Sequence, residues 1–145
     1  MGQVSEILDE KGHRVLMIDA DASVLEAVKQ MVAANVGSLL VTDDGEIAGV
    51  VTERDFLRSV AGDDGGDSGA SVREIMSSPL VVVTPQTSVD ECMALMTNRR
   101  IRHVPVVDDG EVTGIVSIGD VVNAQRDEYE GELDTLQTQI SERGH

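Results

Sequence analysis

The pattern of apolar and polar positions begins twice with a short strand and a helix. Apolar runs at 15–18 and 80–83 are each followed by a polar break and a serine, Ser23 or Ser88. A serine at this position favours a helix start, because its side-chain oxygen accepts a hydrogen bond from an N–H of the first turn. Apolar residues then recur at spacings of three and four, which predicts a helix with one buried face.

Two β-rich runs and a further helix are predicted after each of these helices. The paired runs are 39–41 with 47–52, and 104–107 with 112–117. Each pair is joined through Asp-Asp-Gly, and Asp-Gly between β-rich runs indicates a hairpin turn. The next helix is expected to begin at Glu53 in the first case and at Ile118 in the second. The order strand, helix, strand, strand, helix therefore occurs twice.

The two halves are copies of one sequence. A shift of 65 positions brings Ser23 onto Ser88 and Asp55 onto Asp120, and it aligns the two Asp-Asp-Gly-Glu turns without a gap. One register over such a length indicates an internal repeat. Two short lead-in segments also match, at a spacing of 68, and these are 4–8 and 72–76. Neither copy alone covers both faces of so small a sheet, so we expect the copies to pack together.

The repeat predicts four segments along the chain. These are the first repeat with its lead-in at 1–61, a flexible Gly- and Asp-rich linker at 62–71, the second repeat at 72–125, and an amphipathic C-terminal helix at 126–145. In the last segment the apolar residues form one narrow seam, made of Tyr129, Leu133, Leu136 and Ile140. This seam packs either on its own domain or across a homodimer, and the sequence leaves both open.

Charge and composition exclude several classes of protein. The net charge of -16 argues against general nucleic-acid binding, because phosphate backbones are held by clustered Lys and Arg. The Asp-rich, Lys-poor balance resembles a salt-adapted protein, which high salt stabilises by screening its carboxylates. Cys92 is the sole cysteine, and its apolar neighbours indicate a core thiol. No apolar run approaches a membrane span and no signal peptide is apparent, so we expect a cytoplasmic protein without membrane contact.

A shared motif ends the second hairpin strand of each repeat. Gly49-Val-Val-Thr-Glu-Arg-Asp55 and Gly114-Ile-Val-Ser-Ile-Gly-Asp120 both follow the pattern Gly, apolar, apolar, Ser/Thr, any, any, Asp. Together with Glu74-Ile-Met76, they resemble the cystathionine β-synthase (CBS) domain family. The resemblance covers nearly the whole chain, from about residue 4 to residue 125. The segments 99–107 and 116–122 are especially similar to small stand-alone CBS-pair proteins.

This resemblance implies both a fold and a function. The fold is α/β, a tandem CBS-domain pair or Bateman module, with two β-α-β-β-α repeats related by a pseudo-twofold axis and a long C-terminal helix. The function is that of a regulatory module that binds an adenine nucleotide in two clefts between the repeats. AMP is the first expectation, and ADP, ATP, NAD(H) and S-adenosylmethionine are the others. The resemblance also implies a homodimer that signals ligand state to a regulated enzyme or transporter.

The doubled Ser/Thr-x-x-Asp element suits the chemistry of a nucleotide. A carboxylate at the start of a helix, Asp55 or Asp120, can accept hydrogen bonds from both neighbouring ribose hydroxyls. The hydroxyl of Thr52 or Ser117 and the first free N–H groups of the helix can hold a phosphate. The same residues also satisfy the capping-box pattern, which merely starts a helix. One residue can do both.

The second repeat carries the chain's one basic cluster. Its members are Arg99, Arg100, Arg102 and His103, just before the strand at 104–107. The cluster is either an anion seat, because guanidinium groups hold phosphate through paired donors, or a set of surface ion pairs. The first repeat has no such cluster. Its Arg54, whose counterpart is Gly119, is a candidate to complete a phosphate site that borrows from both repeats.

The expected ligand contacts form one group in each repeat. In the second repeat they are Thr84, Arg100, Arg102, His103, Val104, Pro105, Ser117 and Asp120, and in the first repeat they are Asp19, Ser38, Thr52, Arg54 and Asp55. We expect the cleft around Thr84, His103, Ser117 and Asp120 to bind nucleotide more tightly than the cleft around Asp19, Ser38, Thr52 and Asp55. The reason is that the basic cluster would concentrate an anion there.

Other chemistry has little support in the sequence. The three histidines have no metal-ligand spacing with acids or with Cys92, and neither Gly-rich phosphate-binding fingerprint is present. No nucleophile with its base can be assembled, so no catalytic residue, metal or required cofactor is predicted. Two alternatives remain. One is a constitutive interaction or scaffold protein with non-functional clefts, and the weaker one is an enzyme with a redox-active Cys92.

Overall fold

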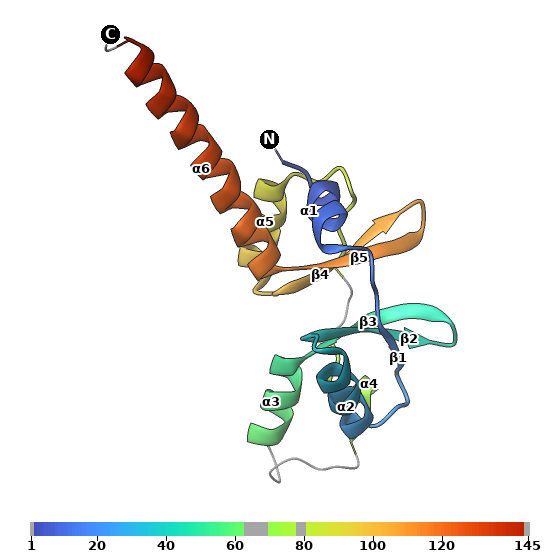
Figure 1. Ribbon diagram of the computed structural model, residues 1–145. Coiled ribbons are helices and arrows are strands. Elements are labelled where there is room, and N and C mark those ends of the chain that lie inside the picture. Colours follow the sequence, from blue (N-terminus) through green and yellow to red (C-terminus); the bar gives the residue numbers. More distant parts are fainter. Residues whose placement is uncertain (1, 63–69, 78–80, 144–145) are drawn as a thin grey trace. The chain divides into compact units, whose positions relative to one another are not determined.

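A computed structural model describes residues 2–62, 70–77 and 81–143, and their side chains as far as residue 131. The order of helices and strands can be followed in Figure 1. They are α1 (Val4–Lys11), β1 (Met17–Asp19), α2 (Val24–Ala34), β2 (Ser38–Asp43), β3 (Glu46–Thr52), α3 (Glu53–Ala61), α4 (Val72–Ile75), α5 (Val89–Arg99), β4 (His103–Asp108), β5 (Glu111–Ser117) and α6 (Ile118–Arg143). The mixed α/β fold and the order of elements in the first repeat are confirmed.

The predicted helix starts are confirmed as well. The Ser23 hydroxyl accepts a hydrogen bond from the N–H of Glu26 at 3.1 Å, and the Ser88 hydroxyl accepts one from the N–H of Glu91 at 3.0 Å. The helix that begins at Ile118 continues to Arg143, so the predicted C-terminal helix is part of α6, from residue 126 onward. In its seam the side chain of Tyr129 is exposed. The side chains of Leu133, Leu136 and Ile140 lie outside the described residues, as does most of the predicted linker, 63–69.

Both predicted hairpins are present and turn through Asp-Gly. Asp44 and Gly45 have φ angles of 53° and 82°, and Asp109 and Gly110 have φ angles of 52° and 80°. Two successive positive φ angles are what a type I′ turn requires, and this turn matches the right-handed twist of the paired strands. The turns join β2 to β3 and β4 to β5, and both pairs of strands are antiparallel.

The first strand of the second repeat is shorter than predicted. In the first repeat β1 pairs with β2 in parallel, and Leu40 N donates to Leu16 O at 2.9 Å. The counterpart of Leu40 is Pro105, which has no N–H to donate, so the equivalent ladder bond cannot form. What remains is a single parallel bridge between Val83 and Val106. The other described residues of the predicted strand, 81–82, are not in a strand.

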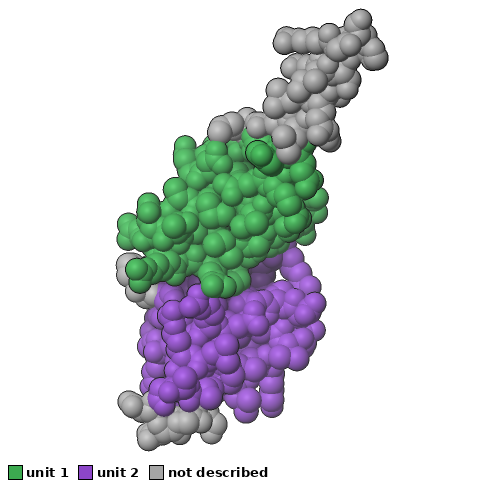
Figure 2. All heavy atoms as spheres, turned by 90° about the vertical axis from the view of Figure 1, so that its left-hand side faces the viewer, with its two compact units in different colours: residues 1–13, 83–145 green, residues 14–82 purple. Residues whose placement is uncertain are grey.

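The chain forms two compact units, and in each unit one repeat packs with the lead-in segment of the other repeat. Unit 1 consists of residues 1–13 and 83–145, and unit 2 of residues 14–82 (coloured separately in Figure 2). Helix α1, the lead-in of the first repeat, therefore packs with the strands and helices of the second repeat. Helix α4, the lead-in of the second repeat, packs with those of the first. The compact units therefore do not coincide with the two sequence repeats.

The glycine of each repeated motif makes room for a lead-in segment. A Cβ atom on Gly49 would lie 2.5 Å from Ser77 O and 3.3 Å from Met76 Sδ, just after α4. A Cβ atom on Gly114 would lie 2.6 Å from Leu8 Cδ2, in α1. A real Cβ atom does not approach other atoms so closely, so both positions need glycine for packing. This glycine is thus explained without a ligand.

Each unit has its own aliphatic core. In unit 1 the buried cluster includes Leu8 from α1, Cys92 and Met96 from α5, and Val121 from α6. In unit 2 it includes Leu39 and Val41 from β2, with Val72 from α4. Cys92 is completely buried, as predicted. No helix in the described part of the chain is both long and apolar enough to cross a membrane.

Candidate functional site

In unit 2 the Thr52–Asp55 pair lies where β3 passes into α3. Asp55 Oδ2 accepts hydrogen bonds from Thr52 N at 2.9 Å and from Thr52 Oγ1 at 3.1 Å. Thr52 Oγ1 in turn accepts one from Asp55 N at 3.3 Å. This reciprocal pair is a capping box, which satisfies two N–H groups at the helix start. Asp55 is only 8% exposed, so one role of its carboxylate is structural.

In unit 1 the Ser117–Asp120 pair repeats this arrangement where β5 passes into α6. Ser117 N donates to Asp120 Oδ2 at 2.8 Å, and Asp120 N donates to Ser117 Oγ at 3.2 Å. A further donor is present here, because Lys11 Nζ at the end of α1 lies 2.7 Å from Asp120 Oδ2. Lys11 Nζ also donates to Ile115 O at 2.9 Å. The carboxylate of unit 1 therefore has a cationic partner.

The pKa of Asp120 is lowered from the ordinary value for aspartate. Partial burial is the largest single influence and acts to raise the pKa, because it disfavours the charged form. The hydrogen bond and charge of Lys11, together with the hydrogen bonds from Ser117, outweigh burial. Asp120 is therefore ionised at neutral pH and can hold the ammonium group of Lys11.

The first residues of β2 and β4 lie beside these pairs. Ser38 is the strand partner of Thr52, and His103 is the strand partner of Ser117. Ser38 is buried and His103 is half-buried. The structure thus brings together Ser38, Thr52 and Asp55 in unit 2. It brings together His103 and the Ser117 pair in unit 1.

Asp19 lies at the opposite end of β2 from Ser38. Parallel pairing of β1 with β2 places Asp19 beside Thr42, four residues further along β2. At about 3.3 Å per residue the separation along the strand is roughly 13 Å. The Asp19 carboxylate instead accepts a hydrogen bond from Asp21 N at 2.8 Å. Asp19 and Ser38 are therefore not direct neighbours in unit 2.

Thr84 stands apart from His103 for the same reason. It directly follows Val83, which pairs with Val106, whereas His103 is the first residue of β4. Thr84 N donates to Thr87 Oγ1 at 3.1 Å, so the Thr84 backbone belongs to a local turn before α5. Among the four residues predicted around this cleft, Thr84 is the one that the structure separates from the others.

The first N–H group of each helix already has an acceptor. Glu53 N donates to Gly37 O at 3.1 Å, and Ile118 N donates to Arg102 O at 2.8 Å. The N–H of each motif aspartate binds the Ser or Thr hydroxyl, as described above. The helix starts therefore offer fewer free N–H groups to a phosphate than the sequence suggests.

The remaining predicted ligand contacts differ in their exposure to solvent. Arg54 is exposed in the first turn of α3, Arg100 is exposed at the left-handed end of α5, and Arg102 is exposed just before β4. Val104 and Pro105 are buried in β4, and the side chain of Val104 belongs to the core cluster of unit 1. The arginines are thus accessible to an anion, whereas the side chain of Val104 is enclosed by the unit.

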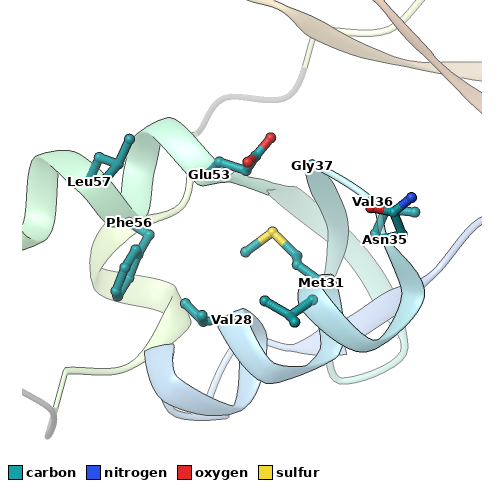
Figure 3. Close-up of a pocket in the computed structure, with 9 residues that line it drawn as sticks. Val28, Met31, Asn35, Val36, Gly37, Glu53, Phe56 and Leu57 are labelled. Atoms are coloured by element: carbon teal, nitrogen blue, oxygen red, sulfur yellow. The ribbon is translucent and has the colours of Figure 1, made fainter.

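Two hollows in the units are lined by residues other than these pairs. One of about 450 Å³ lies between α2 and α3 in unit 2 (Figure 3). Its lining is mainly apolar and consists of Val28, Met31, Val32, Asn35, Val36, Gly37, Glu53, Phe56 and Leu57. Another of about 460 Å³, in unit 1, contains carboxylates that repel phosphate, and these belong to Glu6, Glu10, Asp127 and Glu128. Neither hollow contains a predicted ligand contact.

Neither a metal centre nor a reactive thiol occurs in the described residues. No group of three His, Cys, Asp or Glu side chains in residues 2–62, 70–77 and 81–131 is arranged to hold a metal ion. Burial raises the pKa of the Cys92 thiol, so little thiolate forms at neutral pH. This environment disfavours redox catalysis by Cys92.

Lys11 is a site residue that the sequence analysis missed. It lies 109 positions from Asp120 and precedes the first repeat, so the repeat pattern gives no reason to pair the two. One signal is present in the sequence. Lys11 is one of only two lysines, and it falls where the first copy has three more residues than the second.

Comparisons with known proteins agree on one family. The family model of the CBS domain matches residues 4–62 and 72–127. The chain is 40% identical to the mitochondrial CBS domain-containing protein CBSX3 of Arabidopsis thaliana, over 94% of this chain and 71% of that protein. The crystal structure of a CBS-domain protein from Agrobacterium tumefaciens is similar, with a TM-score of 0.80, 40% identity, and 85% and 92% of the two chains covered. A hexameric CBS-CP12 protein from bloom-forming cyanobacteria gives a TM-score of 0.75 at 34% identity, with 84% and 70% covered.

Proposed function

Because the chain belongs to the CBS domain family, we propose that it is a regulatory module that binds an adenine nucleotide and catalyses no reaction. CBS-domain pairs are generally regulatory modules of this kind. The observation that carries the proposal is the Ser/Thr–Asp pair that starts both α3 and α6. Each pair presents a carboxylate and a hydroxyl at the positive end of a helix dipole.

The carboxylates of Asp55 and Asp120 suit a ribose. A carboxylate has about four lone-pair positions on its two oxygens, and the helix cap uses only Oδ2. A ribose has two neighbouring hydroxyl donors, and one can donate to each carboxylate oxygen. A deoxyribose lacks one of these donors, so the chemistry favours a ribonucleotide.

The arginines of unit 1 suit a phosphate attached to that ribose. Arg102 is held against the start of α6, because its carbonyl oxygen accepts the N–H of Ile118. Arg100 and Arg102 are both exposed, and guanidinium groups bind phosphate through paired donors. AMP is the favoured ligand, because a nucleotide with fewer phosphates is repelled less by a chain of net charge -16.

The regulatory part of the proposal is a shift between arrangements of the chain. A nucleotide that binds one arrangement better than another changes their populations by its difference in affinity. The changed surface would then contact a regulated enzyme or transporter, and we place this signal in the cytoplasm. ADP, ATP, NAD(H) and S-adenosylmethionine are the alternative ligands.

A melting screen tests the proposal. The protein is heated in high salt with AMP, ADP, ATP, NADH or S-adenosylmethionine, and 2′-deoxy-AMP serves as the control. Ligand at a hundredfold excess over its dissociation constant stabilises the native state by about 2.7 kcal/mol. We expect a rise in the melting temperature with AMP and a smaller one with 2′-deoxy-AMP. No shift with any nucleotide would contradict nucleotide binding and favour the scaffold alternative.

We also propose that a second copy of the chain covers the outer face of α2 and α3. Val32 and Leu57 on this face are 74% and 62% exposed, although they border the apolar hollow of Figure 3. The corresponding face of unit 1 is less apolar. Thr97 replaces Val32 there, the counterpart of Leu57 is Val122 at 46% exposed, and Gln125 donates a hydrogen bond to Asp90 at 3.2 Å. Unit 2 thus exposes the larger apolar face, which favours it as the interface.

A further inference from the structure

The ion pair between Lys11 and Asp120 occupies the atom that a ribose would need. Asp120 Oδ2 accepts one hydrogen bond from Ser117 N at 2.8 Å and another from Lys11 Nζ at 2.7 Å. A carboxylate oxygen has two lone pairs, so Oδ2 has no acceptor position left. Two neighbouring ribose hydroxyls bind a carboxylate best when each donates to a different oxygen. Both oxygens of Asp120 are therefore available only when Lys11 leaves.

We propose that Lys11 locks Asp120, and that the ribose of a bound nucleotide must displace Lys11 to bind in unit 1. This inference rests on the proposed function. The lock can open, because the Lys11 side chain is 40% exposed and the Asp120 side chain is 23% exposed. Ion pairs that are open to solvent are weak, so ribose hydroxyls can replace this one at small cost.

Unit 2 has a different arrangement at the same place. Asp55 Oδ2 also accepts two hydrogen bonds, but both come from Thr52, and one donor is a hydroxyl. A hydroxyl can rotate to another acceptor without breaking an ion pair. At the lead-in spacing of 68 the counterpart of Lys11 is Pro79, which carries no cation. The lock therefore belongs to one unit, and a ribose reaches Asp55 without it.

The lock also anchors the first of the two places where the chain passes between the units. Lys11 is bound to Asp120 and Ile115, and two residues later the ring Nδ1 of His13 hydrogen-bonds to Thr113 O at 2.8 Å. The N-terminal stretch of unit 1 ends at His13, and the next residue belongs to unit 2. A ligand that displaces Lys11 removes one of these anchors. Nucleotide binding at Asp120 would thereby loosen the chain where it leaves unit 1. In this way ligand binding in unit 1 can affect unit 2.

Two lysine variants provide a matched test. Lys11→Met keeps an apolar side chain of similar length but removes the ammonium group, and Lys29→Met makes the same charge change on the exposed surface of α2. Binding of adenosine and AMP is measured by calorimetry. We expect Lys11→Met to bind both ligands about twofold to fivefold more tightly than Lys29→Met, the size of a partly exposed ion pair.

The outcomes separate the lock from other roles of Lys11. Weaker AMP binding with unchanged adenosine binding would mean that Lys11 contacts phosphate, and this would overturn the lock. Equal affinities in the two variants would also overturn it. If neither the wild type nor Lys11→Met binds any ribonucleotide, the proposed function fails and the lock fails with it.

A second measurement uses the wild-type protein, in case Lys11→Met folds poorly. The chain has only two lysines, so the NMR spectrum of its side-chain ammonium groups contains two signals. Saturating adenosine should shift the signal of Lys11 and leave that of Lys29 unchanged. An unchanged Lys11 signal at saturation would show that ribose does not displace Lys11, and would overturn the inference.

Discussion

Replacing Gly49 with alanine tests whether α4 is exchanged into unit 2. A Cβ at position 49 would lie 2.5 Å from Ser77 O. Ser77 cannot move freely, because Ser77 N donates to Val50 O at 2.9 Å. Overpacking costs about 1–3 kcal/mol, and a lost hydrogen bond costs about 1 kcal/mol. We therefore expect Gly49→Ala to lower the free energy of unfolding by about 2–4 kcal/mol.

Alanine variants of two other glycines provide the comparison for Gly49→Ala. The free energy of unfolding of each variant is measured by urea denaturation at constant high salt. The Cβ of Gly114→Ala would meet the end of the Leu8 side chain at 2.6 Å, which can rotate, so we expect a loss of about 1–2 kcal/mol. The Cβ of Gly131→Ala would meet no atom of the described residues within 4 Å, apart from those of its own helix turn, and alanine favours a helix by about 0.5–1 kcal/mol. If Gly49→Ala is as stable as Gly131→Ala, the close approach of Ser77 does not exist and the exchange is refuted.

The remaining predictions concern the stability of the fold at low pH and the position of the dimer interface. The pKa values of Asp43, beside Arg73, and of Asp120 are lowered, so both carboxylates stabilise the fold above the unfolded pKa of about 3.9. This contribution is lost as the pH falls through the folded pKa. Urea midpoints at pH 7 and pH 3 should differ less for Asp120→Asn than for the wild type, and equal differences would count against the ion pair. Leu57→Glu should dissociate the dimer in light scattering, whereas its counterpart in unit 1, Val122→Glu, should not. Dissociation by both or neither would place the interface elsewhere.

The features predicted correctly from the sequence depend on local geometry. The Asp44-Gly45 turn requires two positive φ angles, which Gly adopts freely and Asp tolerates, so the turn can be identified from neighbouring residues alone. The helix starts at Ser23 and Ser88 depend on a hydrogen bond that spans three residues. The capping alternative for Thr52 and Asp55 is likewise local, and the structure confirms it. A ligand role for these residues stays a prediction.

The features that the sequence did not predict depend on contacts between distant segments. The repeat pattern assigns each lead-in to the repeat that follows it, and only tertiary packing reveals the exchange of α1 and α4. The ion pair of Lys11 with Asp120 depends on this exchange. The separation of Asp19 from Ser38 follows from parallel pairing, which no local pattern specifies. The short first strand was the exception, since Pro105 marked the missing donor in the sequence itself.

The motif aspartates Asp55 and Asp120 are proposed to bind the ribose of an adenine nucleotide. Calorimetric titration of the wild type with AMP and with 2′-deoxy-AMP tests it most directly. A hydrogen bond to a charged group contributes about 1.5–3 kcal/mol, so 2′-deoxy-AMP should bind roughly tenfold to a hundredfold more weakly than AMP. Equal affinities for the two ligands, or no binding of AMP at all, would contradict the account.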